Sequence, residues 1–178
     1  NIPTILIGTV GNDFTEYKKH LTKTKSLDIS GVKEYKYDSS AIGFVVTDRD
    51  DNQIWGFYQG AMQYSSKISL NKYLNKNDFV VIAPNDPKAV VSYVNECIAK
   101  KVDYLFDPAF NIAHFSKSDL KKAIEHCKIL IGNDYEIELI SRTLNLTKDK
   151  LVTDEQILIT TLGSKGSEIV FNKKVLKY

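Results

Sequence analysis

The sequence predicts an α/β fold with a mostly parallel sheet, because four apolar segments alternate with helical patterns. These segments span residues 79–86, 104–108, 129–136 and 157–167, and each runs into a polar, proline or glycine stop. A helix between successive strands implies that the strands run parallel. Ligands of open α/β sheets bind where the carboxyl ends of such strands meet. We expect that edge to hold Asn85, Asp107, Asn133, Glu136, Thr161 and Gly163.

The segments between these strands carry helix signals. Asp86 and Pro87 form a cap and first-turn signal for a helix that continues to about residue 101. A second helix is expected over residues 118–127, and a third from Asn133 to Leu144. Together with the strands, this order predicts a Rossmann-type sheet with helices on both faces.

The first sixty residues contain a strand and a helix, after which the spacing of the apolar residues changes. Residues 4–10 read as a strand, and residues 14–24 as a helix with a buried stripe of Phe14, Tyr17 and Leu21. From residue 32 to 58 the apolar period becomes two, which predicts an inserted β-meander or hairpin. We therefore expect one α/β domain over residues 1–178, with a small β lid at residues 32–58.

Composition excludes several classes of protein. With 24 Lys and Arg against 22 Asp and Glu, the formal charge is +2 and the basic residues are spread along the chain, so we expect no nucleic-acid partner. No apolar run reaches the ~20 residues that span a bilayer, and a signal-peptide pattern is lacking, so we expect no membrane partner. Cys97 and Cys127 fall at helical core positions, which suits a reducing compartment. A cytoplasmic location is the default expectation.

Two weak motifs follow strand ends. The common phosphate-binding patterns G-x-x-x-x-G-K-[ST] and G-x-G-x-x-G are absent, but Gly163-x-x-Gly166 directly follows a strand. Glycines there would let the backbone approach a phosphate or an adenine, but a tight turn between two strands also explains them and is the interpretation that we favour. Asn133-x-x-Glu136 offers oxygen ligands for a hydrated Mg²⁺ ion, and it also fits a helix cap with Glu136 near the positive end of the dipole. These two interpretations are compatible.

Other chemistry-bearing residues give weaker signals. The three histidines, His20, His114 and His126, form no metal-binding spacing with each other or with the cysteines. His114, on the loop after Asp107, is the strongest candidate of the three for a functional role. Asp107 is expected to cap or form a turn rather than to face phosphate. The aromatic run of Trp55, Phe57 and Tyr58 either packs as part of the lid, which we favour, or forms a wall for a substrate ring.

The order of these signals resembles the PfkB (ribokinase-like) family of sugar and nucleoside kinases, and its adenosine-kinase-like members in particular. The resemblance covers almost the whole chain. It is carried by ILIGTVGNDF (5–14), FYQGAM (57–62), IAPNDP (82–87), FDPA (106–109), NDYE (133–136) and TLGSKGS (161–167).

The resemblance implies transfer of the γ-phosphoryl group of ATP to a hydroxyl of a nucleoside such as adenosine, or of a sugar. It implies that Asn133 and Glu136 match the family's N-x-x-E motif and order Mg²⁺ and phosphates. It also implies that Thr161, Gly163 and Gly166 line the ATP site, and that the strands of residues 32–58 form part of a lid over the acceptor. The sequence leaves open whether a homodimer forms through this β lid.

The chain departs from the family pattern in one important respect. The family's general base is an aspartate in a G-A-G-D motif downstream of the T-L-G segment, and residues 1–178 contain no such motif. The family's N-terminal strand with its substrate-binding aspartate is also missing. We therefore expect the middle portion of a kinase fold with little or no activity, and we assign no catalytic residue within it. A non-catalytic nucleotide-binding module and an unrelated Rossmann-like enzyme are the alternatives.

Overall fold

The computed structural model describes residues 2–50 and 52–178, which divide into two compact units. One unit comprises Asn1–Ile68 and the other Ser69–Tyr178. The arrangement of a single domain over residues 1–178 stays a prediction.

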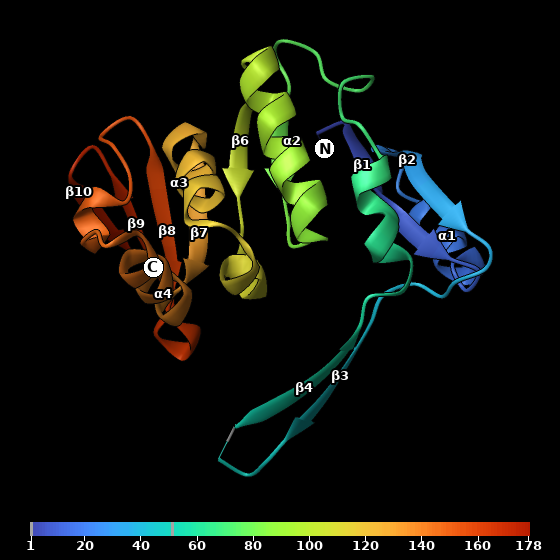
Figure 1. Cartoon of the computed structure of the whole chain (residues 1–178), viewed down its shortest axis with the longest axis horizontal. Helices are drawn as coiled ribbons and strands as arrows, with labels where there is room; N and C mark the ends of the chain where they lie inside the picture. Colours follow the sequence, from blue (N-terminus) through green and yellow to red (C-terminus); the bar gives the residue numbers. More distant parts are fainter. Residues whose placement is uncertain (1, 51) are drawn as a thin grey trace. The chain divides into compact units, whose positions relative to one another are not determined.

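The second unit contains the expected sheet. Its strand order is β10-β9-β8-β7-β6-β5, and β5 to β8 run parallel, whereas β9 and β10 are antiparallel to their neighbours (Figure 1). The prediction of a mostly parallel α/β sheet is therefore confirmed. The strands are β5 (Phe79–Ile82), β6 (Asp103–Phe106), β7 (Ile129–Asn133), β8 (Ile157–Thr161), β9 (Ser167–Phe171) and β10 (Lys174–Lys177).

Helices connect the parallel strands as expected. They are α2 (Pro87–Lys100), α3 (Lys117–His126) and α4 (Asp134–Leu144), with short 3-10 turns at η2 (Ala109–His114), η3 (Lys148–Lys150) and η4 (Gly163–Lys165). The Asp86 carboxylate accepts a hydrogen bond from the Ala89 N–H at 3.1 Å, so it caps α2. Helix α3 starts one residue earlier than expected, because the Ser116 hydroxyl caps it through the Asp119 N–H.

These helices lie on one face of the sheet, which differs from the expectation of helices on both faces. Each parallel strand is added on the same side of the previous one, and right-handed crossovers then place every connecting helix on the same face. Helix α3 packs between α2, which contacts β5 and β6, and α4, which contacts β7 and β8.

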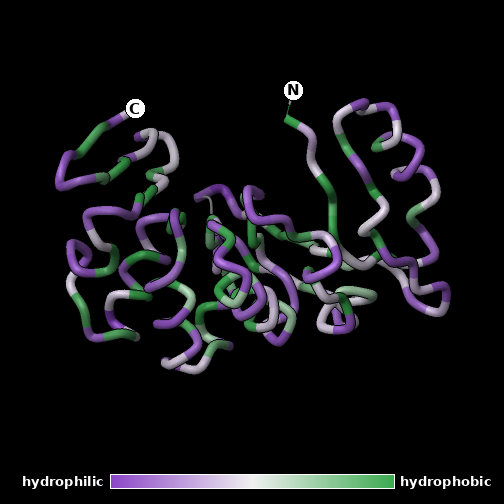
Figure 2. The backbone as a smooth tube through the Cα atoms, turned by 90° about the horizontal axis from the view of Figure 1, so that it is seen from above, coloured by the Kyte–Doolittle hydropathy of each residue, from purple (hydrophilic) through white to green (hydrophobic). Residues whose placement is uncertain are grey.

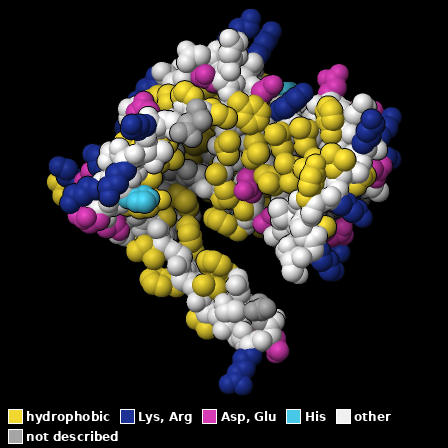
Figure 3. Space-filling view, turned by 180° about the vertical axis from the view of Figure 1, so that it is seen from behind, with side chains coloured by type: hydrophobic (Ala, Val, Ile, Leu, Met, Phe, Trp, Pro, Cys, Tyr) yellow, Lys and Arg dark blue, Asp and Glu magenta, His cyan; other side chains and the backbone are white. Residues whose placement is uncertain are grey.

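The opposite face of the sheet is apolar, and none of the helices within Ser69–Tyr178 covers it. Phe79 and Val81 on β5 are 49% and 63% exposed. The strand pairing places Leu105, Ile131 and Ile159 on the same face. Figure 3 shows hydrophobic side chains gathered on this side. Parallel sheets usually have both faces covered, and strands that are apolar on both faces are typical of them.

The core of this unit lies between the helices and the sheet. The buried Tyr104 donates a hydrogen bond from its hydroxyl to the Ala123 carbonyl at 2.7 Å. The side-chain amide of Gln156 donates to the carbonyls of Ile124 and Cys127, both at 2.7 Å, so this buried polar group is paired. The tube in Figure 2 switches repeatedly between hydrophobic and hydrophilic colour, as amphipathic elements require.

The first unit begins with a strand–helix–strand arrangement. It comprises β1 (Thr4–Gly11), α1 (Thr15–Leu21) and β2 (Leu27–Tyr35), and β2 pairs parallel with β1. The expected meander over residues 32–58 was therefore wrong at its start, since residues 32–35 belong to β2. The pattern of period two indicates a strand but does not identify its partner.

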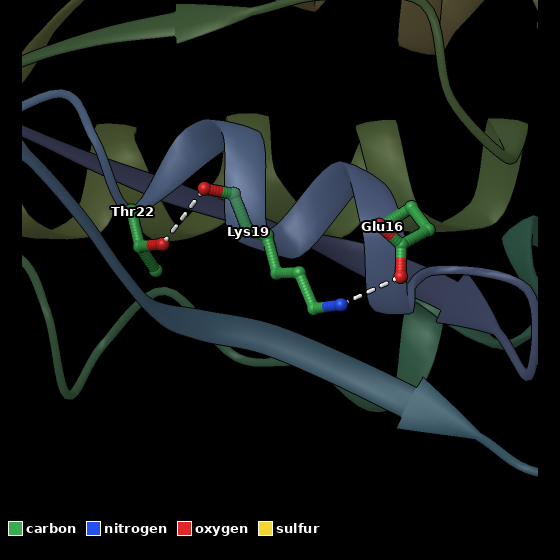
Figure 4. Close-up of polar contacts among 3 residues, drawn as sticks. All are labelled: Glu16, Lys19 and Thr22. Carbon is green, nitrogen blue, oxygen red and sulfur yellow. Dashed lines mark hydrogen bonds and ion pairs between the residues drawn. The ribbon is translucent and has the colours of Figure 1, made fainter.

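Helix α1 is shorter than predicted, and its apolar stripe is only partly buried. Phe14 is buried, but Tyr17 is 60% exposed and stacks on His20 with a centroid separation of 6.0 Å. Two polar contacts lie on the exposed side of α1 (Figure 4). Glu16 and Lys19 form an ion pair at 2.7 Å, and the Thr22 hydroxyl donates a hydrogen bond to the Lys19 carbonyl at 3.1 Å.

The predicted lid is an antiparallel hairpin of β3 (Ile42–Thr47) and β4 (Gln53–Tyr58), which extends away from β1 and β2 (Figure 1). The 3-10 segment η1 (Gly60–Lys67) follows it. None of the described helices combines the length and apolar character that crossing a membrane requires.

Candidate functional site

The polar tips of the parallel strands share one edge of the sheet, as the sequence predicted. Asn133 at the end of β7 is the register partner of Thr161 at the end of β8. Ile82 of β5 and Phe106 of β6 are also partners, so Asn85 and Asp107 leave the sheet at the same edge. Residues from four separate chain segments are thus brought together by strand register alone.

Asn133 and Glu136 form a reciprocal capping box at the start of α4. The Asn133 Oδ1 accepts from the Glu136 N–H at 2.7 Å, and the Glu136 Oε2 accepts from the Asn133 N–H at 2.7 Å. The cap interpretation is confirmed. It fixes both side chains at the positive end of the helix dipole, where negatively charged ligands are stabilised.

Asp107 lies in electrostatic reach of Glu136, although 29 positions separate them. Partial burial raises the pKa of the Asp107 carboxyl, the negative charge of Glu136 raises it further, and the Ala109 backbone N–H opposes the rise. Ala109 itself has a φ of 39°, a left-handed conformation that is unusual for a residue with a Cβ. The negative charge of Glu136 therefore acts on the Asp107 carboxyl at this edge.

The loop after Asp107 is held by a buried residue that sequence analysis did not single out. Asn111 is 2% exposed, and its side-chain amide donates a hydrogen bond to the Asn85 carbonyl at 2.6 Å. This bond ties the loop after β6 to the loop after β5. The signal in the sequence was faint, consisting of one amide residue inside the apolar stretch of residues 109–113.

The two glycines of the turn after β8 have different surroundings. Both have positive φ, 58° at Gly163 and 85° at Gly166. A Cβ at Gly166 would collide with the Tyr178 carbonyl, whereas a Cβ at Gly163 would meet nothing within 4 Å. Gly166 is thus required by packing inside the protein, and Gly163 is the glycine that leaves its backbone accessible from outside.

The remaining predicted features concern metal ligands and the aromatic run of the hairpin. Among the described residues, no group of three or more His, Cys, Asp and Glu side chains could hold a metal ion by themselves. The aromatic run is less packed than we expected, because Trp55 is 62%, Tyr58 50% and Phe57 48% exposed. The Trp55 and Phe57 rings lie over Gly43 of the partner strand.

The fold and the arrangement of its strand ends define a ribokinase-like α/β protein. The model of the pfkB family carbohydrate kinases matches residues 2–178. The chain belongs to this family.

The chain is similar to nucleoside kinases along nearly all of its length. A nucleoside kinase of Methanocaldococcus jannaschii is 32% identical over 181 residues, which cover 97% of this chain and 56% of the relative. The structure of a Burkholderia thailandensis nucleoside kinase in complex with inosine is 25% identical, with a TM-score of 0.90, and the match covers 98% of this chain and 57% of that one. The same kinase has been solved in complex with ADP-inosine. The structure of a ribokinase of Thermotoga maritima is 16% identical, with a TM-score of 0.72, and the match covers 98% of this chain and 59% of that one. This likeness shows the shared fold alone. The chain therefore spans little more than half the length of the curated relatives it matches.

Proposed function

We propose that the protein is an ATP-dependent kinase that transfers the γ-phosphoryl group of ATP to a hydroxyl of a nucleoside, such as adenosine or inosine. A sugar is the second candidate acceptor. Membership of the family and the nucleoside kinases among its relatives support the reaction type and the first acceptor class. The observation that carries the proposal is the alignment of Asn133 with Thr161 at one sheet edge, next to an accessible glycine turn.

The phosphates of ATP would bind between the start of α4 and the turn after β8. The first turn of α4 presents the positive end of its dipole, which favours an anion. Thr161 offers a hydroxyl at the end of β8, and the open side of Gly163 lets a phosphate or adenine approach the backbone. Gly166 would act indirectly, by allowing the turn to close against Tyr178.

Mg²⁺ would bind beside Glu136 and Asn133. Mg²⁺ prefers oxygen ligands, keeps several waters, and is often bound by one or two carboxylates together with substrate phosphates. The capping box uses Oε2 of Glu136 and Oδ1 of Asn133, so Oε1 of Glu136 is the oxygen positioned for such a role. The mutual repulsion of Asp107 and Glu136 supports this assignment, because a cation would relieve it. Bound Mg²⁺ would neutralise charge on the phosphates.

The β3–β4 hairpin would act as a lid that excludes water from the acceptor. Water is the competing acceptor of the phosphoryl group, so exclusion favours transfer to the nucleoside. One face of the hairpin carries Ile42, Phe44, Val46, Ile54 and Tyr58, and the other carries Val45, Trp55 and Phe57.

Both faces of the hairpin are apolar and exposed, and a two-stranded ribbon in water is marginally stable. We infer that one face covers the acceptor and that the other pairs with a second copy of the protein, giving a homodimer through the β lid. A cytoplasmic location fits the need for ATP and the two free, buried cysteines.

The magnesium role is tested by calorimetric titration with ATP, with and without Mg²⁺. Glu136→Gln keeps a side-chain acceptor for the cap but removes the charge. We expect it to weaken Mg²⁺-dependent ATP binding about tenfold, while Mg²⁺-free binding stays the same or tightens because repulsion is lost. Glu138→Gln, on the exposed side of the same helix, is the matched control and should change neither. Equal behaviour of the two variants would remove Glu136 from the metal site.

The non-catalytic alternative is tested by turnover. Residues 1–178 contain no G-A-G-D aspartate, so we expect them by themselves to bind ATP with little or no phosphoryl transfer. A longer form of the protein that carried a G-x-G-D motif should phosphorylate a nucleoside. Tight ATP binding without transfer in that longer protein would favour the binding module.

A further inference from the structure

The two connections of the hairpin to its unit meet at one point, which we call the root and define as residues 38–40 and 58–60. The Asp38 carboxylate accepts hydrogen bonds from the Tyr58 hydroxyl at 2.8 Å and from the Gln63 side-chain amide at 3.0 Å. One carboxylate thus joins the segment that enters β3, the last residue of β4 and η1.

The entry side of the root is held firmly against the end of β1. The Asp13 carboxylate accepts from the Ser40 N–H at 3.0 Å and from its hydroxyl at 2.7 Å, and the Ser40 hydroxyl accepts from the Gly11 N–H at 3.0 Å. A Cβ at either Gly11 or Gly60 would collide with the backbone of Ser39. This close packing leaves the entry segment little freedom.

The exit side is held differently. Tyr58 is half exposed, and its hydroxyl reaches Asp38 across the root. The hydrogen bond to Asp38 raises the pKa of Tyr58, so the hydroxyl remains protonated and able to donate at neutral pH. Only Ala41 separates the fixed Ser40 from the start of β3, and Gln59 separates Tyr58 from Gly60, whose φ is 49°. These two residues are the available pivots.

We propose that Asp38 and Tyr58 form a latch that fixes the angle of the hairpin relative to β1 and β2. When the latch opens, the hairpin swings about Ala41 and Gln59 while its own β3–β4 pairing stays intact. The consequence for catalysis rests on the proposed lid function, in which Tyr58 is a positioning residue that sets how the lid meets the acceptor.

The latch is tested by measuring distances between spin labels at Lys33→Cys on β2 and Arg49→Cys beyond β3, using electron paramagnetic resonance without nucleotide. Both label sites are exposed, whereas the native Cys97 and Cys127 are buried and stay unlabelled. We expect one narrow distance distribution for the parent protein. Tyr58→Phe, which removes the hydroxyl and keeps the ring, should raise the unlatched population about five- to tenfold and broaden the distribution.

Two further variants complete the design. Asp38→Ala removes the bond to Tyr58 together with the bonds from the Gln63 amide and the Ser39 N–H, so it should broaden the distribution at least as much as Tyr58→Phe. Adding Tyr58→Phe to Asp38→Ala should change little, because the bond to Tyr58 is already lost. Tyr37→Phe makes the same chemical change at a fully exposed neighbour and should leave the distribution narrow. An unchanged distribution in Tyr58→Phe would overturn the latch.

Enzyme kinetics separate the latch from the proposed function. In the active kinase, Tyr58→Phe should raise KM for the acceptor about fivefold with little change in kcat, since a misplaced lid weakens acceptor binding. A general loss of folding would lower the amount of active enzyme and leave KM unchanged. A broadened distance distribution with unaltered kinetics would keep the latch and remove its role in catalysis.

Discussion

Gly163 offers the sharpest separation between a structural and a ligand-binding role. Its φ of 58° lies in the left-handed region, which costs a residue with a Cβ about 1–2 kcal/mol. The added methyl group of Gly163→Ala would meet nothing within 4 Å, so backbone strain is the whole cost. For a chain of this size, we expect the melting temperature to fall by roughly 2–8 °C.

The same methyl group would occupy the space through which a phosphate or adenine reaches the backbone. We expect ATP affinity to fall roughly 10- to 100-fold, which corresponds to the loss of one hydrogen bond to a charged group. Acceptor affinity should remain unchanged. Urea unfolding followed by circular dichroism measures the stability term, and calorimetric titration with ATP and Mg²⁺ measures the binding term.

Two other glycines serve as controls. Gly166→Ala combines strain at a φ of 85° with a collision against the Tyr178 carbonyl, so it should destabilise the protein more than Gly163→Ala. Gly8→Ala adds a methyl group in open space on β1 and should change neither stability nor ATP affinity by much. The reasoning is refuted if Gly163→Ala is as destabilising as Gly166→Ala, or if it binds ATP as tightly as the parent protein.

Three further predictions concern buried or partly buried groups. Thr160 is 2% exposed and its hydroxyl has no hydrogen-bond partner among the described residues, so Thr160→Val should stabilise the protein by about 1 kcal/mol in urea unfolding, and a clear loss would contradict this. Burial raises the pKa of the Cys97 and Cys127 thiols to about 12, so a disulfide reagent at pH 8 should label neither in the folded protein and both in denaturant. Because burial and Glu136 raise the pKa of Asp107, its stabilising contribution is present below the ordinary value of 3.8 and is lost as pH rises through the folded pKa. The urea concentration at the midpoint of unfolding should therefore be higher for Asp107→Asn than for the parent protein at pH 7, and the same for both near pH 3. Equal midpoints at pH 7 would contradict the repulsion between Asp107 and Glu136.

The strands of the parallel sheet could be predicted because each combines a short apolar run with an abrupt polar stop. Their parallel direction followed from the helices between them. The partner of β2 could not be predicted, since alternation of period two is the same whether a strand pairs parallel with β1 or antiparallel with β3. The location of α2 to α4 on a single face depends on the order of the strands in space, which the sequence does not contain.

Some features of the candidate site could likewise be predicted from the sequence, and others could not. The capping box of Asn133 and Glu136 was readable from their spacing, because it is a local interaction within one helical turn. Gly163 and Gly166 looked equivalent in the sequence, and only the position of the Tyr178 carbonyl distinguishes them. The proximity of Asp107 to Glu136 depends on the register of β6 and β7, so it could not be predicted from either segment alone.

The proposed position of the nucleotide is tested most directly by paramagnetic relaxation. Mn²⁺ can replace Mg²⁺ in a complex with ATP, and it broadens the amide resonances that lie close to it. We predict broadening at Asn133, Glu136, Thr161 and Gly163, which lie at or just beyond the carboxyl ends of β7 and β8. Broadening confined to the opposite ends of the strands, near Asp103 and Ile129, would contradict the assignment of this edge as the nucleotide site.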